Sequence, residues 1–329
     1  MPLRPILSSI GSFSYDCAKW LSDSLSELRH HETCVKDTLM FLSLVQDRSS
    51  SEKIVTSFDV TSLFTNVPVD FAINLILDFV FRRSYEFNGL NSRRTKKLLE
   101  WVVKTTTFQF NGRFHLEVDS VAMGSPIAPL MADVCVNYVI DQALAVTPPE
   151  CRSDLLCRYV DDLFLLFPKE DSLNRFFTNV SSIHRNIFFT KELETNNCLH
   201  FLDVSTEKTS TGFITSTYRK PTHTGLYSKW SSFVPLHRKR NFANSLLRRA
   251  YDIASSYQLV HTEFMNIKRM LSCNGYPDNF WTVAFSNSST ENTLSRNNVM
   301  HRLNPLLHPN IFYYNYRIWV LYLITYDRN

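Results

Sequence analysis

The sequence predicts an α+β fold, because strand patterns and amphipathic helix patterns follow one another along the chain. The run KIVTSFDV at 53–60 is β-branched and apolar, as central strands are. The run TTTFQFNGRFHLEV at 105–118 predicts an antiparallel hairpin that turns at Asn111-Gly112, a dipeptide favoured in two-residue loops. A helix follows Pro68, and its apolar face is formed by Val69, Ile73, Ile76 and Val80.

The composition is that of a soluble globular protein with one large or two modest domains. The chain has 329 residues, of which 44% are hydrophobic and 20% charged. Its seven cysteines include no CxxC pair and no zinc-site spacing, and we find no secretory signal, so we expect a reduced, intracellular setting. The apolar run at 311–326 contains Asn315 and Arg317 and falls short of the roughly 20 residues of a membrane span, so no membrane partner is predicted.

The segment MGSPIAPLMADVCVNYVIDQAL at 123–144 predicts a second long helix. Ser125 is expected to be its N-cap and Pro126 its first residue, because these residue types favour those positions. The inward face is expected to consist of Ile127, Leu130, Met131, Val134 and Tyr138.

Two adjacent carboxylates interrupt the apolar run CRYVDDLFLLF at 157–167. We expect strand, two-residue tip and strand, with Asp161 and Asp162 at the tip. Two anions roughly 4 Å apart repel by about 4 kcal/mol at an effective dielectric constant near 20. Either exposure of the turn to water or a bound divalent cation would offset that repulsion.

The order of three features favours the cation over a simple solvated turn. Asp59 lies near the end of the predicted strand 53–60, a Gly-Ser-Pro helix start follows, and the aromatic-x-Asp-Asp hairpin comes last. Nucleotidyl transfer by two metal ions needs carboxylates on rigid strand ends, and Mg²⁺ prefers such oxygen ligands.

A long basic stretch separates Glu207 from Asp252, with no acidic residue between them. Its aromatic residues are interleaved with the basic ones, which is typical of surfaces that bind phosphates and stack on bases. A merely solvated face is the alternative. The candidate nucleic-acid-binding residues are Arg219, Lys220, Tyr227, Lys229, Trp230, Arg238, Lys239 and Arg240.

Two helices are predicted between about 237 and 273, and the second is expected to end before Gly275. The inward residues of the first are expected to be Phe242, Leu246, Leu247, Ala250, Ala254 and Tyr257. Those of the second are Val260, Phe264, Ile267 and Leu271.

Four segments resemble the successive palm motifs of reverse transcriptases: SFDVTSLFTNVPVD (57–70), MGSPIAPLMADV (123–134), RYVDDLFLLF (158–167) and FLDV (201–204). The amino-acid sequences of these segments are most similar to the reverse transcriptases of Penelope-like retroelements, which are relatives of telomerase catalytic subunits. SLFTNVP is typical of that group, as are the segments 3–21, 215–232, 237–255 and NGYP at 274–277. The resemblance covers about residues 3 to 285.

This resemblance implies a right-hand polymerase, with an α+β palm built on an antiparallel sheet, partial fingers and a helical thumb. It places partial fingers and palm entry at 1–50, the palm at 51–205 and a basic thumb with a helix-turn-helix-like segment at 206–285, and leaves 286–329 unassigned. The implied activity is RNA-directed DNA synthesis by two-metal transfer to a primer 3′-hydroxyl. The implied partners are an RNA template, a DNA primer, deoxynucleotides and two Mg²⁺ ions, with Mn²⁺ as a substitute.

The resemblance also implies a role for each residue of the site. Asp59 and Asp161 would bridge the metals, and Asp162 would complete the catalytic triad. The backbone carbonyl of Val60 would add a metal ligand. The ring of Phe64 would crowd a ribonucleotide 2′-hydroxyl, although a core aromatic would look the same in sequence.

Further residues would contact the nucleotide. Gly124, Ser125 and Pro126 would form the floor under the templating pair. Arg4 would lie near the nucleotide phosphates, unless it is simply a solvated terminal charge.

The departures from the family pattern support alternatives. The chain begins within the fingers, lacks the GIY-YIG endonuclease domain and diverges after Pro277, so a truncated, catalytically inactive nucleic-acid-binding remnant is the main alternative. A telomerase-type enzyme with its own RNA is a third, against which the lack of a preceding RNA-binding domain counts. A nuclear location follows from the retroelement analogy alone.

Overall fold

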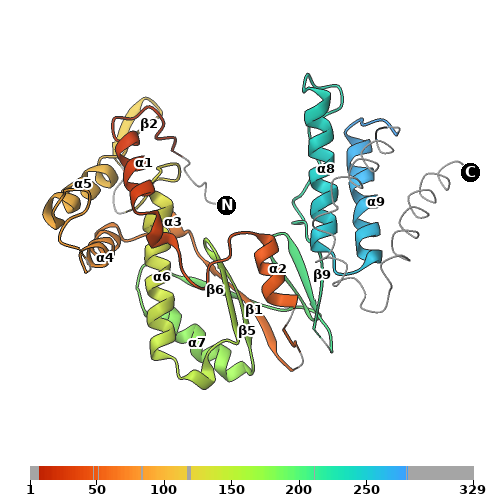
Figure 1. Cartoon of the computed structure of the whole chain (residues 1–329), viewed down its shortest axis with the longest axis horizontal. Coiled ribbons are helices and arrows are strands. Elements are labelled where there is room, and N and C mark those ends of the chain that lie inside the picture. Colours follow the sequence, from red (N-terminus) through yellow and green to blue (C-terminus); the bar gives the residue numbers. More distant parts are fainter. Residues whose placement is uncertain are drawn as a thin grey trace, which may run out of the picture. The chain divides into compact units, whose positions relative to one another are not determined.

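The computed structural model describes residues 7–46, 48–50, 52–82, 84–116, 120–210, 212–278 and 280. The chain divides into two compact units (Figure 1). The first unit comprises 1–36 and 52–195, and the second comprises 37–51 and 196–329. The predictions for Arg4 and for 286–329 lie outside the described residues. The domain boundaries derived from the motifs stay predictions.

In the part of the first unit that the structure describes, four strands form an antiparallel sheet in the order β4-β5-β1-β6. Their bounds are Leu155–Tyr159 for β4, Asp162–Phe167 for β5, Ile54–Val60 for β1 and Phe189–Leu193 for β6. The predicted strand at 53–60 is therefore confirmed as an inner strand. The antiparallel sheet with its helices is the expected α+β arrangement.

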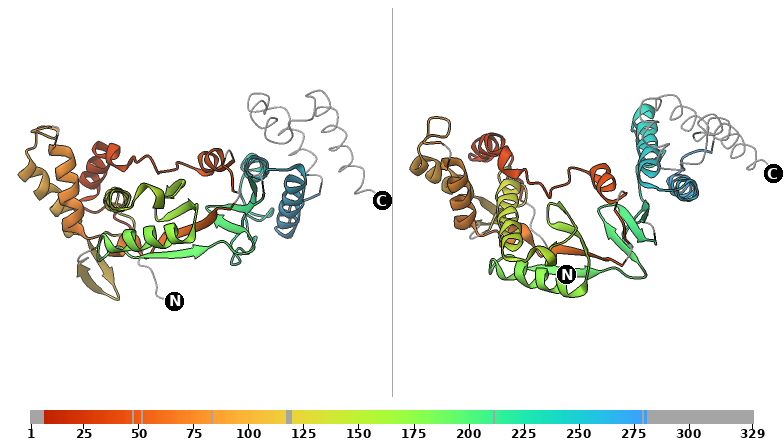
Figure 2. Two further views of the ribbon diagram at one scale, coloured as in Figure 1. Left: turned by 90° about the horizontal axis from the view of Figure 1, so that it is seen from below. Right: turned by 60° about the horizontal axis from the view of Figure 1, so that its bottom comes forward.

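Helices complete the first unit and enclose its core. They are α1 (Tyr15–Ser24), η1 (Ser26–Arg29), α3 (Leu63–Asn66), α4 (Val69–Phe81), α5 (Ser92–Lys104), α6 (Ala128–Val146), η2 (Pro149–Cys151) and α7 (Glu170–Ser182). Helix α6 contacts α4 and α7, while α4 and α5 lie side by side (Figures 1 and 2). The ring of Phe176 on α7 packs 6.4 Å from that of Phe58 and 5.7 Å from that of Phe167, which ties α7 to the sheet.

The predicted hairpin at 105–118 forms as β2 (Thr107–Phe110) and β3 (Arg113–Leu116). Phe110 pairs with Arg113, so Asn111 and Gly112 are the loop, with φ angles of 50° and 75°. Positive φ at both loop residues is what a type I′ turn requires, and Asn-Gly supplies it at low cost. This prediction is confirmed.

Helix α6 begins two residues later than expected. Its N-cap is Ile127, so the prediction of Ser125 as N-cap and Pro126 as first residue is wrong. Residues before the helix are held in turns by bonds from the Ser125 N–H to the Ala122 carbonyl and from the Ala128 N–H to the Ser125 carbonyl. The expected inward face is confirmed, since Ile127, Leu130 and Met131 are buried and the other two residues pack on the core.

By length and composition, α6 would also be long and apolar enough to cross a membrane. However, 56% of its apolar window is buried inside the structure. Burial in a protein core accounts for its composition.

The described part of the second unit has a sheet in the order β7-β8-β9 and three helices. The bounds are α2 (Thr38–Gln46), β7 (Cys198–Phe201), β8 (Val204–Lys208), β9 (Phe213–Thr217), α8 (Leu236–Ile253) and α9 (Tyr257–Cys273). Helices α8 and α9 lie side by side (Figures 1 and 2). Their shared core consists of Ala243, Leu247, Ala250, Ile267, Leu271, Tyr276 and Phe280.

The two helices predicted near 237–273 are therefore confirmed, but two residues expected on the first helix, Ala254 and Tyr257, lie outside it. Tyr257 opens α9, whereas the sequence pattern assigned it to the first helix. The chain leaves the helical conformation at Ala254, and Ser256 caps α9 by accepting a bond from the Leu259 N–H.

Candidate active site and nucleic-acid-binding residues

The fold brings the three candidate carboxylates to one end of two neighbouring strands. The register of β1 and β5 places Asp59 directly opposite Asp162. The Val60 N–H donates to the Asp161 carbonyl at 3.0 Å, which extends the contact to the third residue. Side chains of directly opposed residues project from the same face of an antiparallel pair, with Cβ atoms about 4.5–5.5 Å apart.

The tip of the hairpin differs by one residue from the expectation. Tyr159 pairs with Asp162, so the two loop residues are Val160 and Asp161. Asp162 is the first residue of β5 and belongs to the strand. The register therefore places one carboxylate on the loop and two on rigid strand ends.

The carboxylates suit a hard divalent cation that is shared with a substrate. Among the described residues, no group of three or more His, Cys, Asp or Glu side chains is arranged to hold a metal ion unaided. Mg²⁺ is normally bound by one or two carboxylates together with water and substrate phosphates. The opposed Asp59 and Asp162, with Asp161 beside them on the loop, offer carboxylates of the kind that such a set needs. Asp59 is exposed, and the other two are partly buried.

Gly124 lies where another chain segment approaches closely. A Cβ atom at this position would lie 2.2 Å from the carbonyl oxygen of Leu7. Gly124 has a φ of 118°, a backbone conformation that glycine adopts readily and other residues rarely adopt. The Leu7 N–H donates to the Met123 carbonyl at 2.8 Å, and Ser9 Oγ donates to the Gly124 carbonyl at 2.9 Å. The segment before α6 is thus held by the N-terminal segment. Ser125 and Pro126 follow, both partly buried.

Phe64 and Val60 lie beside the carboxylates in sequence but face different surroundings. Val60 is buried at the end of β1. Phe64 lies on α3, partly buried against the core, and its carbonyl accepts from the Val121 N–H at 3.1 Å. This packing suits both a core aromatic and a ring at the edge of a nucleotide site, so both interpretations stay open.

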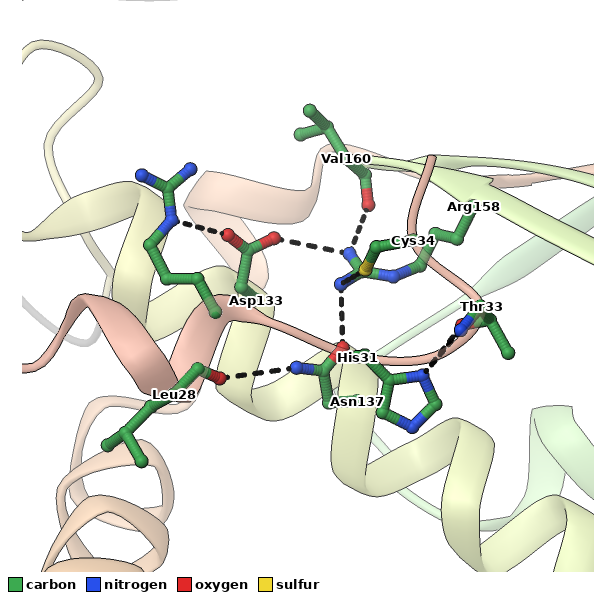
Figure 3. Close-up of polar contacts among 9 residues, drawn as sticks. Leu28, His31, Thr33, Cys34, Asp133, Asn137, Arg158 and Val160 are labelled. Atoms are coloured by element: carbon green, nitrogen blue, oxygen red, sulfur yellow. Dashed lines mark hydrogen bonds and ion pairs between the residues drawn. The ribbon is translucent and has the colours of Figure 1, made fainter. Parts of the chain in front are cut away.

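Arg158 is the functional candidate that motif reasoning missed. Its side chain is only 1% exposed, and its guanidinium donates to four groups around the hairpin tip (Figure 3). The signal in the sequence is an arginine at an inward position of an otherwise apolar strand. Buried arginine is rare unless it is paired, so an arginine at this position is expected to have a hydrogen-bond or ion-pair partner.

Four of the basic candidates in the second unit are exposed: Lys220, Lys229, Arg238 and Arg240. Arg238 and Arg240 project from the first turns of α8. Exposed ammonium and guanidinium groups of this kind can neutralise phosphates.

Two other basic candidates are bonded inside the second unit. Lys239 is 6% exposed, and its Nζ donates to the carbonyls of Trp230 and Ser232. Arg219 makes a bidentate pair with Glu263, and this hydrogen bond raises the pKa of the Arg219 guanidinium. Their expected contacts with nucleic acid stay predictions.

The two aromatic candidates pack on the core of the second unit. The ring of Tyr227 meets that of Phe242 edge-on at 5.0 Å. The ring of Trp230 lies 5.4 Å from that of Tyr276, beneath the ammonium of Lys239 at 5.1 Å. Both rings are partly buried, and they stabilise the loop before α8.

A cavity of about 380 Å³ collects several of these groups. Arg219, Lys220 and Tyr227 line it together with the ion pair of Arg249 and Asp203. A pocket of this size with cationic and aromatic walls is large enough for part of a nucleotide.

Two family models match successive parts of the chain. Residues 7–212 match the family described as reverse transcriptase (RNA-dependent DNA polymerase), and residues 226–283 match the animal helix-turn-helix domain. No curated protein matches the chain.

The solved structures that resemble this chain include telomerases and a viral RNA polymerase. Telomerase from Candida tropicalis, in complex with a TWJ fragment of telomeric RNA, has 12% identity and a TM-score of 0.50, over 86% of this chain and 49% of that chain. Its apo form has 11% identity and a TM-score of 0.49, over 82% and 52%. The Sicinivirus 3Dpol RNA-dependent RNA polymerase has 11% identity and a TM-score of 0.45, over 77% and 54%. The chain spans about half the length of each of these structures.

The family match includes all three carboxylates, the Gly-Ser-Pro segment and the hairpin that carries Asp161, and it extends over more than half of the chain. The first of the three structures supports a polymerase palm for the fold. The chain therefore belongs to the reverse transcriptase (RNA-dependent DNA polymerase) family.

Proposed function

We propose that this chain is an RNA-directed DNA polymerase that joins a deoxynucleotide to a primer 3′-hydroxyl on an RNA template. The observation that carries the proposal is the register that sets Asp59 opposite Asp162, with Asp161 beside them on the loop. Opposed like charges repel each other, and a divalent cation bound beside them would offset that repulsion. A site that tolerates this cost is well suited to bind metal-bound triphosphate.

Each carboxylate would have a separate task in this reaction. Asp59 and Asp161 would hold two Mg²⁺ ions, for which Mn²⁺ could substitute, and Asp162 would complete the site. When bound, such ions stabilise negative charge on the attacking and leaving oxygens. The chain itself contributes geometry, because two of the three carboxylates project from hydrogen-bonded strand ends.

We assign the proposed contacts with the template and primer to the exposed residues Lys220, Lys229, Arg238 and Arg240. They lie in and beside the match to the animal helix-turn-helix domain. Each phosphate contact would add to the salt dependence of binding. The description of the matching family, RNA-dependent DNA polymerase, supports RNA as the template here.

The finer assignment that we propose is to a Penelope-like retroelement, and a nuclear location would follow from that analogy alone. This assignment is based on segments such as SLFTNVP and TSTYRKPTHTGLYSKWSS, whose amino-acid sequences are typical of that group.

Phe64 offers a test of sugar selection. Replacing it by alanine would remove the ring that we expect to clash with a 2′-hydroxyl, so ribonucleotide use should rise relative to deoxynucleotide use. We expect the ratio of the two kcat/KM values to change by at least about tenfold, which corresponds to about 1.4 kcal/mol. Single-nucleotide extension with each substrate measures it. An unchanged ratio would leave Phe64 as a core aromatic.

Primer extension by the purified chain tests the proposed function. The assay uses an RNA template with an annealed DNA primer, deoxynucleotides and Mg²⁺. The Asp161→Asn, Asp162→Asn double variant should be inactive, whereas Asp171→Asn, which removes an exposed charge on α7, should extend as the wild type does. Template binding without extension by the wild type would instead favour the inactive remnant.

A further inference from the structure

The hairpin tip that carries Asp161 has a backbone conformation that its own sequence does not favour. Val160 has a φ of 57°. Positive φ is a genuine outlier for a β-branched residue, and such strain persists only where surrounding structure enforces it. The Val160 side chain is 38% exposed, so its own packing does little to enforce the conformation.

A hydrogen bond from a buried side chain provides the restraint. Arg158 lies two residues before Val160 on β4, and its Nη1 donates to the Val160 carbonyl at 2.8 Å (Figure 3). This bond anchors the peptide group that joins Val160 to Asp161. It therefore fixes the orientation of the chain as it enters the candidate metal ligand.

The guanidinium is itself fixed by three side chains from outside the hairpin. Nη1 also donates to Asp133 Oδ1 at 3.2 Å, and Nη2 donates to Asn137 Oδ1 at 2.6 Å and to Cys34 Sγ at 3.0 Å. Asp133 and Asn137 lie one turn apart on α6. The tip of the hairpin is thus tied to the helix that follows Gly124.

The backbone of Arg158 is fixed as well. Its N–H donates to the Thr33 carbonyl at 2.7 Å, and its carbonyl accepts from the Val35 N–H at 2.9 Å. With both its backbone and its side chain held, the guanidinium has little freedom to follow a shift of the tip.

We propose that Arg158 is a positioning residue for the polymerase reaction: it pins the Val160 carbonyl and so holds Asp161 in the orientation that binds metal. This inference rests on the proposed function. The chemistry of the side chain supports it, because only a planar group with five donors can serve Asp133, Asn137, Cys34 and a backbone carbonyl together. A lysine has a single nitrogen and cannot reach all four.

A stabilising role alone would not explain the choice of residue. Well-packed apolar side chains often replace a buried ion pair without loss of stability. The bond to Val160 is the contact that such a replacement could not reproduce.

The test compares Arg158→Lys in two backgrounds, wild type and Val160→Gly. Glycine adopts positive φ without strain, so the tip then depends less on the arginine. In the wild-type background we expect Arg158→Lys to lower the extension rate by about 100-fold, as a small misplacement of a reacting group does, and to raise the Mg²⁺ concentration for half-maximal rate. In the Val160→Gly background the loss should be about tenfold or less.

A matched control separates this effect from loss of the Asp133 ion pair. Arg29 also bonds Asp133, with Nε 2.8 Å from Oδ2, but it does not contact the tip. Arg29→Lys should leave both the extension rate and the Mg²⁺ dependence within about twofold of wild type, because the Arg29 side chain is 44% exposed and lysine keeps its positive charge.

Equal losses from Arg158→Lys in the two backgrounds would overturn the inference, as would an unchanged Mg²⁺ dependence. Failure of the wild type to extend a primer would instead defeat the proposed function. The same four proteins can then be compared by urea unfolding. Non-additive stabilities would show that Arg158 holds Val160, and additive ones would show that it does not.

Discussion

Asp59 and Asp162 face each other across neighbouring strands, although two carboxylates in this position repel. The cost of this repulsion is small beside the stability of a domain. Under the proposed function, a metal ion bound beside this pair would offset the repulsion. These two contributions can be separated by experiment.

Replacing Asp59 by asparagine should stabilise the metal-free chain and abolish primer extension. Removal of one of two opposed charges is expected to raise the free energy of unfolding by about 0.2–1 kcal/mol. Urea unfolding with and without Mg²⁺ measures this. Mg²⁺ should stabilise the wild type more than the variant, because a ligand of the folded state raises its stability by mass action. A variant that is less stable than the wild type without Mg²⁺ would contradict this account.

At the scale of elements, the loop before α8 shows that basic residues close in sequence have different tasks. Lys239 is buried and donates to two carbonyls of this loop, whereas Arg238 and Arg240 beside it are exposed. The first is placed to stabilise the helix-turn-helix segment. The other two are among the residues that we propose to contact phosphates.

Methionine substitutions should separate these tasks. Lys239→Met should destabilise the chain by about 1–3 kcal/mol, because two loop carbonyls lose their donor. Arg238→Met and Arg240→Met should leave stability unchanged within about 0.5 kcal/mol. Each should make the salt dependence of duplex binding weaker, because the slope of log binding constant against log salt concentration should become less negative by about 0.9. Thermal unfolding and salt-dependent binding titrations measure both effects. A salt slope unchanged by Arg238→Met would remove it from the interface.

Local patterns predicted most of these elements, and the errors came from contacts that are distant in sequence. The spacing of Val69, Ile73 and Ile76 and the Asn111-Gly112 turn depend on nearby residues, and both predictions are confirmed. The start of α6 was misplaced, in a segment held through Gly124 by Leu7, more than a hundred residues earlier. No local pattern contains that contact.

The candidate site shows the same limit. The order of Asp59, Asp161 and Asp162 along the chain was enough to predict their meeting. The role of Arg158 was not predicted, because its partners lie on α6 and before α2. Likewise, a count of charges cannot show that Lys239 is occupied by backbone carbonyls.

At the scale of the whole molecule, the two kinds of candidate residue belong to different units. The carboxylates lie in the first unit, and the candidate nucleic-acid-binding residues lie in the second. Changes in the carboxylates should therefore affect chemistry with little effect on binding. Changes in the exposed basic residues should mainly affect binding.

Cysteine reactivity offers a measure of global stability for the first unit. Cys135 on α6 is fully buried, which raises the pKa of its thiol to about 12, whereas Cys273 on α9 is exposed. At pH 8 we expect Cys273 to be alkylated rapidly and Cys135 only through unfolding. Above the ordinary thiol pKa of 9.0, the unfolded chain ionises first, so stability should fall as pH rises. Mass spectrometry of peptides from timed labelling measures the alkylation rates of the two cysteines, and repeating it at higher pH measures the change in stability. Equal labelling rates would contradict the buried position of α6.

The most direct test of the central claim is to sequence the DNA made on an RNA template of mixed sequence. The wild-type chain, with Mg²⁺ and a DNA primer, should produce a complementary strand that depends on all four deoxynucleotides. The Asp161→Asn, Asp162→Asn variant should bind the same template and produce none. Product from the variant at the wild-type rate, or wild-type product unrelated to the template, would contradict the assignment of these carboxylates to templated DNA synthesis.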